Sequence, residues 1–344
     1  MKKVNWGVLG FGKASNYFIR SVINTKNANL YAISSFSHYQ NLISNKKSLN
    51  LNKVKIYQNY LELLEDNNVD AVYIGLTNNL HSEWIKNCIE FNKNILCEKP
   101  SAINSKEFIN CYNLIKKKNI IFTEALMYRH HPQTLELIKL IRSKLIGEIF
   151  EIKSYCGFDI GKKFFNFELK RLNYDSRLLN KDLGGGAILD LGCYPLTMSM
   201  LISGLSKNKN YLTPVVLKKK VKIGVSKVDE YADIELLFAN NIKAYCEVAI
   251  RKKLKNEVII KGTKGQIIIK SPWLPGNNFF FEITLTNSSK KEVIQFNCDD
   301  EIFVYLIENM SECILLKKKE LNYPAITNLE ILEYLKIIDQ WKIF

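Results

Sequence analysis

The amino-acid sequence predicts an α/β protein in which a doubly wound parallel sheet is followed by an α+β domain with a large, mostly antiparallel open sheet. Three observations lead to this prediction. The chain has 344 residues, enough for two domains at roughly 150 residues each. Short apolar runs alternate with amphipathic stretches over the first 123 residues. Longer stretches with a period of two follow residue 148.

The first 123 residues have the pattern of a parallel sheet covered by helices. Segment 104–117 is the clearest helix. Asn104 and Glu107 have the spacing of a capping box, and apolar side chains then recur on one helical face. Short runs rich in β-branched and aromatic residues mark the strands. They are predicted at Val4–Leu9, Leu30–Ser34, Val54–Tyr57, Ala71–Leu76, Asn94–Cys97 and Ile120–Thr123.

The rest of the chain has the alternation of an antiparallel sheet with one buried face. Asn240-Asn241 and Thr263-Lys264-Gly265 supply turn residues between neighbouring strands. Because the pattern changes near residue 124, we expect residues 1–123 and 124–344 to form the two domains. The strands and closing helices of the second domain are predicted at Ile149–Phe158, Val215–Gly224, Tyr231–Phe238, Ile242–Ile250, Glu257–Lys261, Gln266–Lys270, Phe280–Leu285, Glu292–Phe296, 301–316 and 328–341.

The formal net charge is +15, from 49 basic and 34 acidic residues. Proteins that bind nucleic acid often have such a charge, but arginine is the residue that reads bases and phosphates best. Only six of the basic residues are arginines, and the lysines are spread along the whole chain. We therefore interpret the charge as a solvated, lysine-rich surface and expect no nucleic-acid partner.

The eight cysteines lie far apart and show no C-x-x-C pair, so a reduced, cytoplasmic protein is expected. His130 and His131 have no third convergent ligand, which argues against a zinc site. No signal peptide is expected, because the first apolar run ends in glycines. Segment 187–206 is the most apolar, but an aspartate and a proline interrupt it. We therefore expect a buried helix there and no membrane span.

A glycine-rich turn follows the first predicted strand. Gly10-Phe11-Gly12-Lys13-Ala14-Ser15 fits the pattern G-x-G-x-x-G with serine in place of the third glycine. Gly10 would form the tight turn, Gly12 would let a pyrophosphate approach the backbone, and a small residue at position 15 would keep helix and strand close. The N-terminal domain is therefore predicted to be a Rossmann domain that binds NAD(P).

The end of the second strand bears on the choice of coenzyme. An acidic residue there would accept hydrogen bonds from a free 2′-hydroxyl of the ribose, but the sequence has Ser34-Ser35-Phe36. The missing carboxylate favours NADP slightly over NAD, with Ser35 and Lys13 as candidate contacts to a 2′-phosphate. No arginine accompanies them, so the expected coenzyme is NADP or NAD.

Lys99 lies where an open α/β sheet binds its ligands. The fifth strand ends in Cys97-Glu98-Lys99-Pro100, and such ligands sit beyond the carboxyl ends of the strands. Proline at position 100 restricts Lys99 to an extended conformation and permits a cis peptide bond between them. We expect Lys99 to reach the coenzyme. A surface lysine before a turn is the alternative.

A second glycine cluster precedes Asp190 and Tyr194. Gly184-Gly185-Gly186 opens an apolar segment in which these two residues are four positions apart, and hence on one face of a helix. A buried carboxylate requires a partner, and Lys99 is the candidate for Asp190. Taken alone, a structural aspartate and a core tyrosine would be the simpler interpretation.

Taken together, these motifs resemble those of the Gfo/Idh/MocA oxidoreductases, named for glucose–fructose oxidoreductase and inositol dehydrogenase. The resemblance covers essentially the whole chain. It rests on Gly10-Phe11-Gly12, Thr77–His81, Glu98-Lys99-Pro100 and Gly184–Tyr194. Segment Glu124–Pro132 is similar to the branch that contains glucose–fructose oxidoreductase and dihydrodiol dehydrogenase. Ser15 and Phe36 depart from the family pattern, the latter where NADP-preferring members often have arginine.

The resemblance implies that Lys99 and Tyr194 serve the hydride-transfer site and that Asp190 positions or tunes them. Removing a hydride from an alcohol carbon leaves alkoxide-like charge on oxygen unless its proton departs, so a cation and an acid/base are both useful. Lys99 would supply the charge and Tyr194 would transfer the proton, with Lys99 as the alternative for that transfer. Arg129 and Arg177 are predicted to bind substrate, with structural ion pairs as the alternative.

Further coenzyme contacts are predicted at the carboxyl ends of the parallel strands. His81 follows the fourth strand, and a packing role at a helix N-terminus is the equal alternative for it. The full predicted set is Gly10, Phe11, Gly12, Lys13, Ala14, Ser35, Thr77, Asn79, His81, Glu98 and Lys99.

The sequence thus predicts an NAD(P)-dependent oxidoreductase acting on a secondary alcohol or ketone of a sugar, cyclitol or related polyol. A non-catalytic coenzyme-binding regulator and a glycoside-processing enzyme that uses nicotinamide transiently are the alternatives. Retention of Lys99, Asp190 and Tyr194 argues against the regulator. An open antiparallel sheet needs its second face covered, so a homodimer or higher homo-oligomer through the C-terminal sheet is expected.

Overall fold

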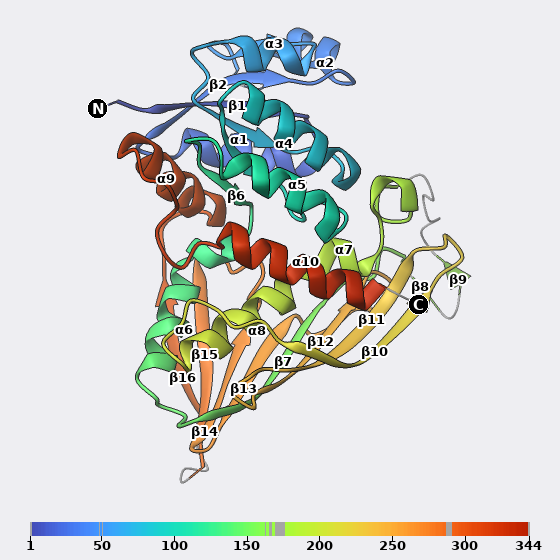
Figure 1. Ribbon diagram of the computed structural model, residues 1–344, viewed down its shortest axis with the longest axis vertical. Coiled ribbons are helices and arrows are strands. Elements are labelled where there is room, and N and C mark those ends of the chain that lie inside the picture. Colours follow the sequence, from blue (N-terminus) through green and yellow to red (C-terminus); the bar gives the residue numbers. More distant parts are fainter. Residues whose placement is uncertain are drawn as a thin grey trace. The chain divides into compact units, whose positions relative to one another are not determined.

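The computed structural model describes residues 2–47, 49, 51–161, 163–164, 167–168, 176–286 and 291–342. The chain divides into two compact units, whose elements are labelled in Figure 1. The first unit comprises the chain up to His130 together with Asp300–Asn328. The second comprises His131–Asp299 together with the chain from Leu329. The chain therefore passes between the two units three times.

A six-stranded parallel sheet forms the centre of the first unit. Its strand order is β3-β2-β1-β4-β5-β6, and every neighbouring pair is parallel. This is the strand order of a Rossmann sheet, which confirms the fold predicted for the N-terminal part of the chain. The strands are β1 (Val4–Leu9), β2 (Ala28–Ser34), β3 (Lys55–Tyr57), β4 (Ala71–Ile74), β5 (Asn94–Cys97) and β6 (Phe122–Glu124).

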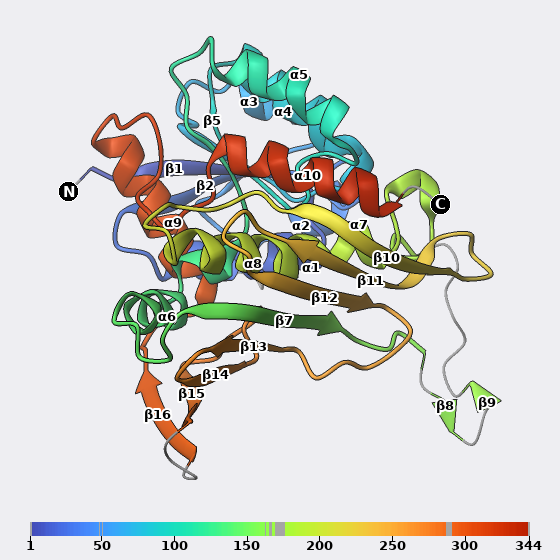
Figure 2. The same cartoon turned by 60° about the horizontal axis from the view of Figure 1, so that its bottom comes forward.

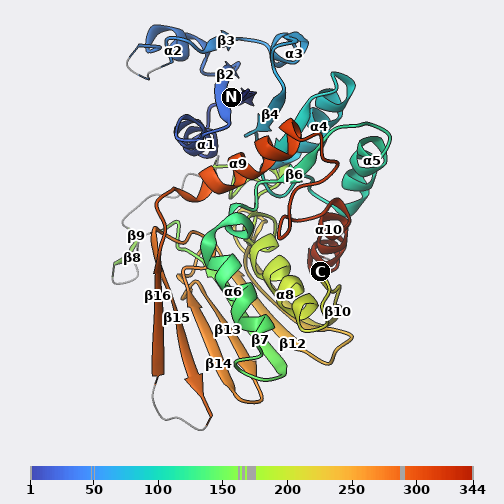
Figure 3. The same cartoon turned by 90° about the vertical axis from the view of Figure 1, so that its left-hand side faces the viewer.

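Helices pack on both faces of this sheet. In Figure 3, α1 and α9 lie on one side of it, and α3, α4 and α5 lie on the other. Helix α5 begins as predicted, because the Asn104 side chain accepts a hydrogen bond from the backbone amide of Glu107 at 2.8 Å. The elements are α1 (Lys13–Ile23), α2 (Tyr39–Ser44), α3 (Tyr60–Glu65), the 3-10 turn η1 (Asn78–Leu80), α4 (His81–Glu90), α5 (Ser105–Ile115), the 3-10 turn η2 (Met127–His130) and α9 (Ile302–Leu315).

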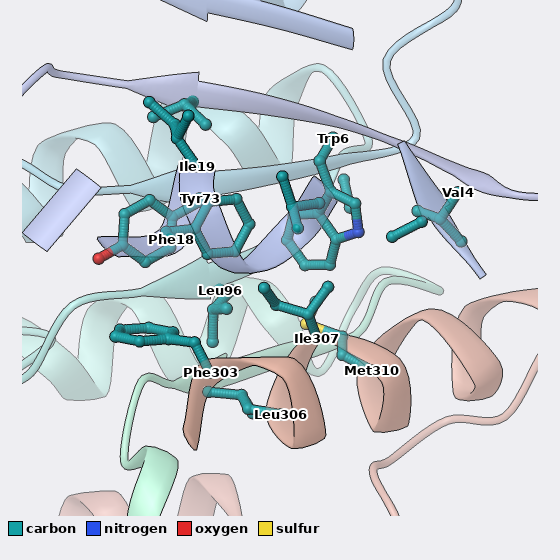
Figure 4. Close-up of a cluster of buried hydrophobic side chains, with 14 of the residues drawn as sticks. Val4, Trp6, Phe18, Ile19, Tyr73, Leu96, Phe303, Leu306, Ile307 and Met310 are labelled. Atoms are coloured by element: carbon teal, nitrogen blue, oxygen red, sulfur yellow. The ribbon is translucent and has the colours of Figure 1, made fainter. Parts of the chain in front are cut away.

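Helix α9 completes the core of the first unit, although its sequence was assigned to the second domain. Phe303 and Ile307 on α9 belong to the same buried cluster as Trp6 and Phe18 (Figure 4). The indole Nε1 of Trp6 donates to Ser311 Oγ at 3.0 Å. The apolar face of α9 thus covers a surface that the first 123 residues leave open, which is why the compact units differ from the predicted division at 123/124.

An eight-stranded sheet forms the centre of the second unit (Figure 2). Its order is β10-β11-β12-β7-β13-β14-β15-β16, and all neighbours are antiparallel except β12 and β7. The predicted large, mostly antiparallel sheet is confirmed. The strands are β7 (Ile149–Gly157), β10 (Val215–Ile223), β11 (Asp229–Leu237), β12 (Lys243–Ala249), β13 (Glu257–Gly262), β14 (Gly265–Lys270), β15 (Asn278–Leu285) and β16 (Lys291–Asn297), and β8 (Lys163–Phe164) pairs separately with β9 (Phe167–Glu168).

Helices α6 and α8 cover one face of the eight-stranded sheet (Figure 2). Every residue of α8 is buried, as predicted for this apolar segment. Among the described residues, one helical segment, Lys181–Leu205, is long and apolar enough to cross a membrane, and its apolar window lies entirely inside the fold. The helical elements are α6 (Pro132–Arg142), the 3-10 turn η3 (Lys181–Leu183), α7 (Ala187–Leu191), α8 (Cys193–Leu205) and α10 (Asn328–Lys342).

Candidate functional site

The turn after β1 is built on close backbone contacts. Gly10 has φ +91°, and a Cβ there would lie 2.8 Å from the carbonyl oxygen of Gly75, so only glycine fits. Ser15 in the first turn of α1 is fully buried, and its Oγ donates to the same carbonyl at 3.4 Å. The small residue predicted at position 15 therefore brings α1 close to the end of β4.

Gly12 is a glycine for a different reason. A Cβ at this position would meet no atom within 4 Å, and its φ of −84° is open to any residue. Gly12 is the N-cap of the 11-residue helix α1, which has no side-chain cap among the described residues and no acidic residue in its first turn. The amides of Lys13 and Ala14 thus lie at an uncapped, electropositive helix end. This arrangement fits the pyrophosphate of a dinucleotide.

The loop after β2 carries no carboxylate at the strand end. Ser35 is buried there, and its Oγ accepts the backbone amide of His38 at 3.3 Å. The His38 ring lies 5.9 Å from the ring of Phe11 in the glycine turn. Phe36 is 75% exposed. Ser35 therefore shapes the loop, and its burial does not support the predicted contact with a 2′-phosphate. His38, which the sequence did not single out, is the accessible polar side chain beside Phe11.

The loop after β4 contains three predicted coenzyme contacts. The Thr77 hydroxyl donates to Asn79 Oδ1 at 2.7 Å, and both side chains are half-buried. His81 is fully buried, with Nδ1 2.7 Å from the Pro100 carbonyl and Nε2 3.1 Å from the Leu76 carbonyl. The imidazole thus links the loops after β4 and β5. These contacts favour the packing role of His81 over direct contact with a coenzyme.

Lys99 follows β5 and is half-buried. Its peptide bond to Pro100 is cis, as the sequence permitted. Glu98 is buried, and its carboxylate accepts the Tyr73 hydroxyl at 2.6 Å and the Lys99 amide at 3.3 Å. Glu98 is therefore engaged in holding the backbone of Lys99, in addition to any contact with a coenzyme.

Glu124 holds the same segment from the neighbouring strand. It ends β6, is 1% exposed, and accepts the backbone amide of Ser101 at 2.7 Å. Burial, followed by the charges of Glu124 and Glu98, holds the pKa of the Cys97 thiol well above its ordinary value. Glu124 was part of a family-like segment in the sequence, but only the structure assigns it this contact.

Arg129 does not face solvent. It is 1% exposed, its Nε donates to the Tyr128 hydroxyl at 3.0 Å, and its Nη1 donates to the Pro324 carbonyl at 3.4 Å. These contacts give Arg129 a structural role in the first unit, and its contact with substrate stays a prediction.

Neither neighbouring histidine has the surroundings of a metal ligand. Burial and the Arg129 charge lower the pKa of His130 to about 3, and burial lowers the pKa of His131 to about 4. His131 Nδ1 accepts the backbone amide of Gln133 at 3.0 Å. Within the described part of the chain, no group of three or more His, Cys, Asp or Glu side chains is placed to hold a metal ion.

In the second unit, the three glycines before α7 have separate roles. Gly184 has φ +73° and ends the turn η3. A Cβ on Gly185 would lie 2.6 Å from the carbonyl oxygen of Arg177. Gly186 has φ +109°, and a Cβ there would lie 2.3 Å from Oδ1 of Asp229. The cluster thus folds the loop that carries Arg177 against the start of α7.

Asp190 on α7 pairs with Arg177. Arg177 Nη1 and Asp190 Oδ1 are 2.9 Å apart, and the two side chains are 48% and 7% exposed. The sequence proposed Lys99 as the partner of Asp190. That pairing stays a prediction, and within the second unit Asp190 pairs with Arg177, because the glycine cluster brings residue 177 back to α7. The ion pair left open as an alternative for Arg177 is therefore confirmed, and its contact with substrate stays a prediction.

Tyr194 lies just after the junction of α7 and α8. Backbone hydrogen bonds from Gly192 to Ile188 at 2.8 Å and from Leu196 to Gly192 at 3.2 Å continue the helical path across this junction. Asp190 and Tyr194 therefore keep the helical spacing predicted for them.

Trp273 is a neighbour of Tyr194 that the sequence did not identify. Their ring centroids are 5.8 Å apart with a tilt of 36°, and Tyr194 is 7% exposed. The Trp273 Nε1 donates to the Tyr155 carbonyl at 2.9 Å, which fixes the indole. Trp273 lies in an irregular segment after β14 and belongs to no motif, so no pattern in the sequence pointed to it.

Comparison with known proteins places both units in one family. Residues 4–126 match the model described as "Oxidoreductase family, NAD-binding Rossmann fold", and residues 134–268 match "GFO/IDH/MocA C-terminal domain". The trans-1,2-dihydrobenzene-1,2-diol dehydrogenase of Xenopus tropicalis is 30% identical over 271 residues, 78% of this chain and 76% of that protein.

Two further proteins are similar over different extents. The D-xylose 1-dehydrogenase (NADP(+)) 2 of Haloferax volcanii is 33% identical over 148 residues, 43% of this chain and 42% of that protein. The structure of an aldose-aldose oxidoreductase from Caulobacter crescentus, complexed with glycerol, superposes with a TM-score of 0.83 at 21% identity and covers 99% of this chain and 96% of that one. At this identity, the similarity to the Caulobacter structure shows a common fold.

Replacing Gly10 and Gly12, the two glycines of the turn after β1, should affect different properties of the protein. Gly12→Ala should leave the melting temperature unchanged and weaken NADPH binding by about tenfold or more, because the methyl group enters the space open to a pyrophosphate. Gly10→Ala should lower the melting temperature, because of its positive φ and the nearby Gly75 carbonyl. Thermal unfolding and a fluorescence titration measure both. Wild-type affinity in Gly12→Ala would contradict the site.

Proposed function

Because the chain belongs to the Gfo/Idh/MocA family of oxidoreductases, we propose that it transfers a hydride between NADP or NAD and a secondary alcohol or ketone of a sugar, cyclitol or related polyol. The observation that carries the proposal is the ion pair of Asp190 with the half-exposed Arg177. Asp190 itself lies four residues before Tyr194. Such a pair offers both donors and an acceptor to hydroxyl groups. The names of the Xenopus and Haloferax relatives, which refer to a diol and to xylose, support this substrate class.

Each candidate residue has a chemical task in such a reaction. The nicotinamide ring, when bound, supplies or accepts the hydride. The ammonium group of Lys99 balances the negative charge that develops on the substrate oxygen, and the Tyr194 hydroxyl exchanges a proton with that oxygen. Arg177 donates to a neighbouring hydroxyl while Asp190 holds its guanidinium in place. The Arg177–Asp190 pair has no net charge, which suits a neutral sugar better than a phosphorylated one.

Substituting the two reacting residues should separate catalysis from coenzyme binding. Lys99→Ala and Tyr194→Phe should each lower kcat by about 10²–10⁴-fold, because each removes a group that acts on the substrate oxygen. NADPH affinity of Tyr194→Phe should stay within about twofold of wild type, since Tyr194 belongs to the second unit. Tyr155→Phe, on β7 of the same unit as Tyr194 and outside this site, is the matched control and should keep wild-type kcat. Initial rates with both coenzymes against a panel of sugars, cyclitols and polyols measure these effects.

Two results would favour the alternative functions. Tight NADPH binding by the wild type with no turnover of any panel member would contradict the proposal and favour a non-catalytic regulator. Cleavage of a glycoside with no net change in the oxidation state of the coenzyme would favour a glycoside-processing enzyme.

For the coenzyme we propose NADP. The loop after β2 has serine where an acidic residue would repel a 2′-phosphate. His38 and Lys13 flank the glycine turn and are accessible, so either can donate to a phosphate oxygen. The Haloferax relative is named for NADP(+), which also supports this choice.

Phe36 offers a direct test of coenzyme choice, because its side chain is 75% exposed and can be changed without a packing cost. Wild-type protein should bind NADPH more tightly than NADH. Phe36→Arg should raise this preference by about tenfold through a charge-assisted hydrogen bond, and Phe36→Asp should lower it by a similar factor. Equilibrium titrations of the three proteins with both coenzymes measure the ratio. Equal affinities in all three would show that this loop does not contact the 2′-position.

We also propose a cytoplasmic homo-oligomer that forms through the uncovered face of the eight-stranded sheet. On this face the rings of Tyr155 and Tyr245 lie 6.2 Å apart, and Ile259 and Ile268 are half-buried on the adjoining strands. Tyr245 also borders a hollow of about 380 Å³ that reaches Leu217 on β10. Aromatic and β-branched side chains on an otherwise polar sheet face are typical of a protein interface.

The mass in solution checks this arrangement. Light scattering should give at least twice the 39.8 kDa of one chain. Ile268→Lys should shift the mass toward 39.8 kDa, because it places a charge in the middle of the proposed contact. Leu274→Lys, at an exposed position outside the strands, is the control and should leave the mass unchanged. A wild-type protein of single-chain mass at micromolar concentration would overturn the proposal.

A further inference from the structure

We propose that Asp229 is a positioning residue for the reaction: its buried carboxylate fixes the start of α7 and thereby the places of Asp190 and Tyr194. Asp229 begins β11, 41 residues after Ile188. The inference rests on the proposed function, because it assigns Asp229 a part in the same site.

The Asp229 carboxylate caps α7 from a distance in sequence. Its Oδ2 accepts the backbone amide of Ile188 at 2.6 Å, and the neighbouring amide of Ala187 also helps to lower the pKa of this carboxyl. Both amides belong to the first turn of α7, where backbone donors have no acceptor within the helix. The N-cap residue itself is Gly186, which has no side chain to provide one. The carboxylate on β11 therefore takes the place of a capping side chain.

Gly186 and Asp229 fit each other closely. A Cβ on residue 186 would lie 2.3 Å from Asp229 Oδ1, and Gly186 has φ +109°, which side chains rarely adopt. A residue with a side chain at position 186 would thus displace the carboxylate. The need for glycine at position 186 is therefore explained by the Asp229 carboxylate, which occupies the space of a side chain.

The Asp229 carboxylate is buried where it contacts α7. The residue is 6% exposed, and burial raises the pKa of its carboxyl to about 6. The amides of α7 and, from α10, the charge of Lys342 oppose this rise. A buried carboxylate without such donors would be costlier still, so the contacts to α7 offset part of the cost of burial.

Helix α7 depends on contacts from outside. It has five residues, Ala187–Leu191, too few to be stable alone. Asp229 holds its start, and Trp341 of α10 packs against Gly192 at its end. Asp190 lies only two positions after the capped amide of Ile188. Displacement of reacting groups by about 1 Å can cost about 10²-fold in rate, so kcat should respond to the loss of the cap.

The test compares three single variants and one double variant with wild type. Asp229→Ala should lower kcat by about 10- to 100-fold, while NADPH affinity, a property of the first unit, stays within about twofold. Asp229→Asn should restore most of kcat, because its amide oxygen still accepts from Ile188. Gly186→Ala should lower kcat in the wild type but have a smaller effect in the Asp229→Ala background, where the carboxylate that it displaces is absent. Steady-state kinetics and hydrogen exchange of the amides of 187–191 are measured on the same samples.

The outcomes separate this inference from the proposed function. Absence of turnover in the wild type would defeat the proposed function, and hydrogen exchange would still decide whether Asp229 holds α7. A folded Asp229→Ala with wild-type kcat and unchanged exchange at 187–191 would overturn the inference. If Asp229→Ala does not fold, Gly186→Ala and Asp229→Asn carry the test, and equal kcat in both would overturn it.

Discussion

Both groups of candidate site residues depend on backbone segments that approach each other more closely than a Cβ permits. In the first unit, Gly10 meets the carbonyl of Gly75, and this contact sets the turn that leads into α1. In the second unit, Gly185 meets the carbonyl of Arg177, and this contact brings the guanidinium to Asp190. Gly12 differs from both, since the space beside it is empty of protein atoms. Glycines that serve the fold can thus be told apart from a glycine that serves a ligand.

Buried carboxylates then fix the backbone that these glycines have shaped. Glu124 accepts the amide of Ser101, two residues after Lys99, and Asp229 accepts the amide of Ile188, two residues before Asp190. In each case the acidic group comes from a neighbouring strand and binds main-chain amides. A buried carboxylate is costly unless its oxygens accept hydrogen bonds. Moving the amides away from it would therefore cost free energy. The backbone beside each candidate reacting group is thereby tied to a sheet.

Periodicity and motifs in the sequence predicted both sheets, the glycine turn and the positions of Lys99, Asp190 and Tyr194 along the chain. These features are local, since helix and strand periods and glycine spacing are written in consecutive residues. Contacts between distant residues were not predictable in this way. Nothing around Asp229 in the sequence indicates that it caps a helix 41 residues earlier. The pairing of Asp190 with Arg177 was likewise hidden, because it follows from the conformation of a glycine-rich loop.

The position of α9 illustrates the same limit on the scale of a whole unit. The hydrogen bond from Trp6 to Ser311 spans 305 residues, and Phe303 closes the cluster around Phe18. The change in hydrophobic pattern near residue 124 marks where the strands of one sheet end and those of the other begin. The core of the first unit nevertheless includes residues much later in the chain. Trp341, after this segment, returns to the second unit and packs on Gly192. The core of each unit is therefore complete only when one of the last two helices, α9 or α10, has been synthesised. Folding of both sheets thus depends on contacts between residues far apart in the sequence, although each sheet is recognisable from its own segment.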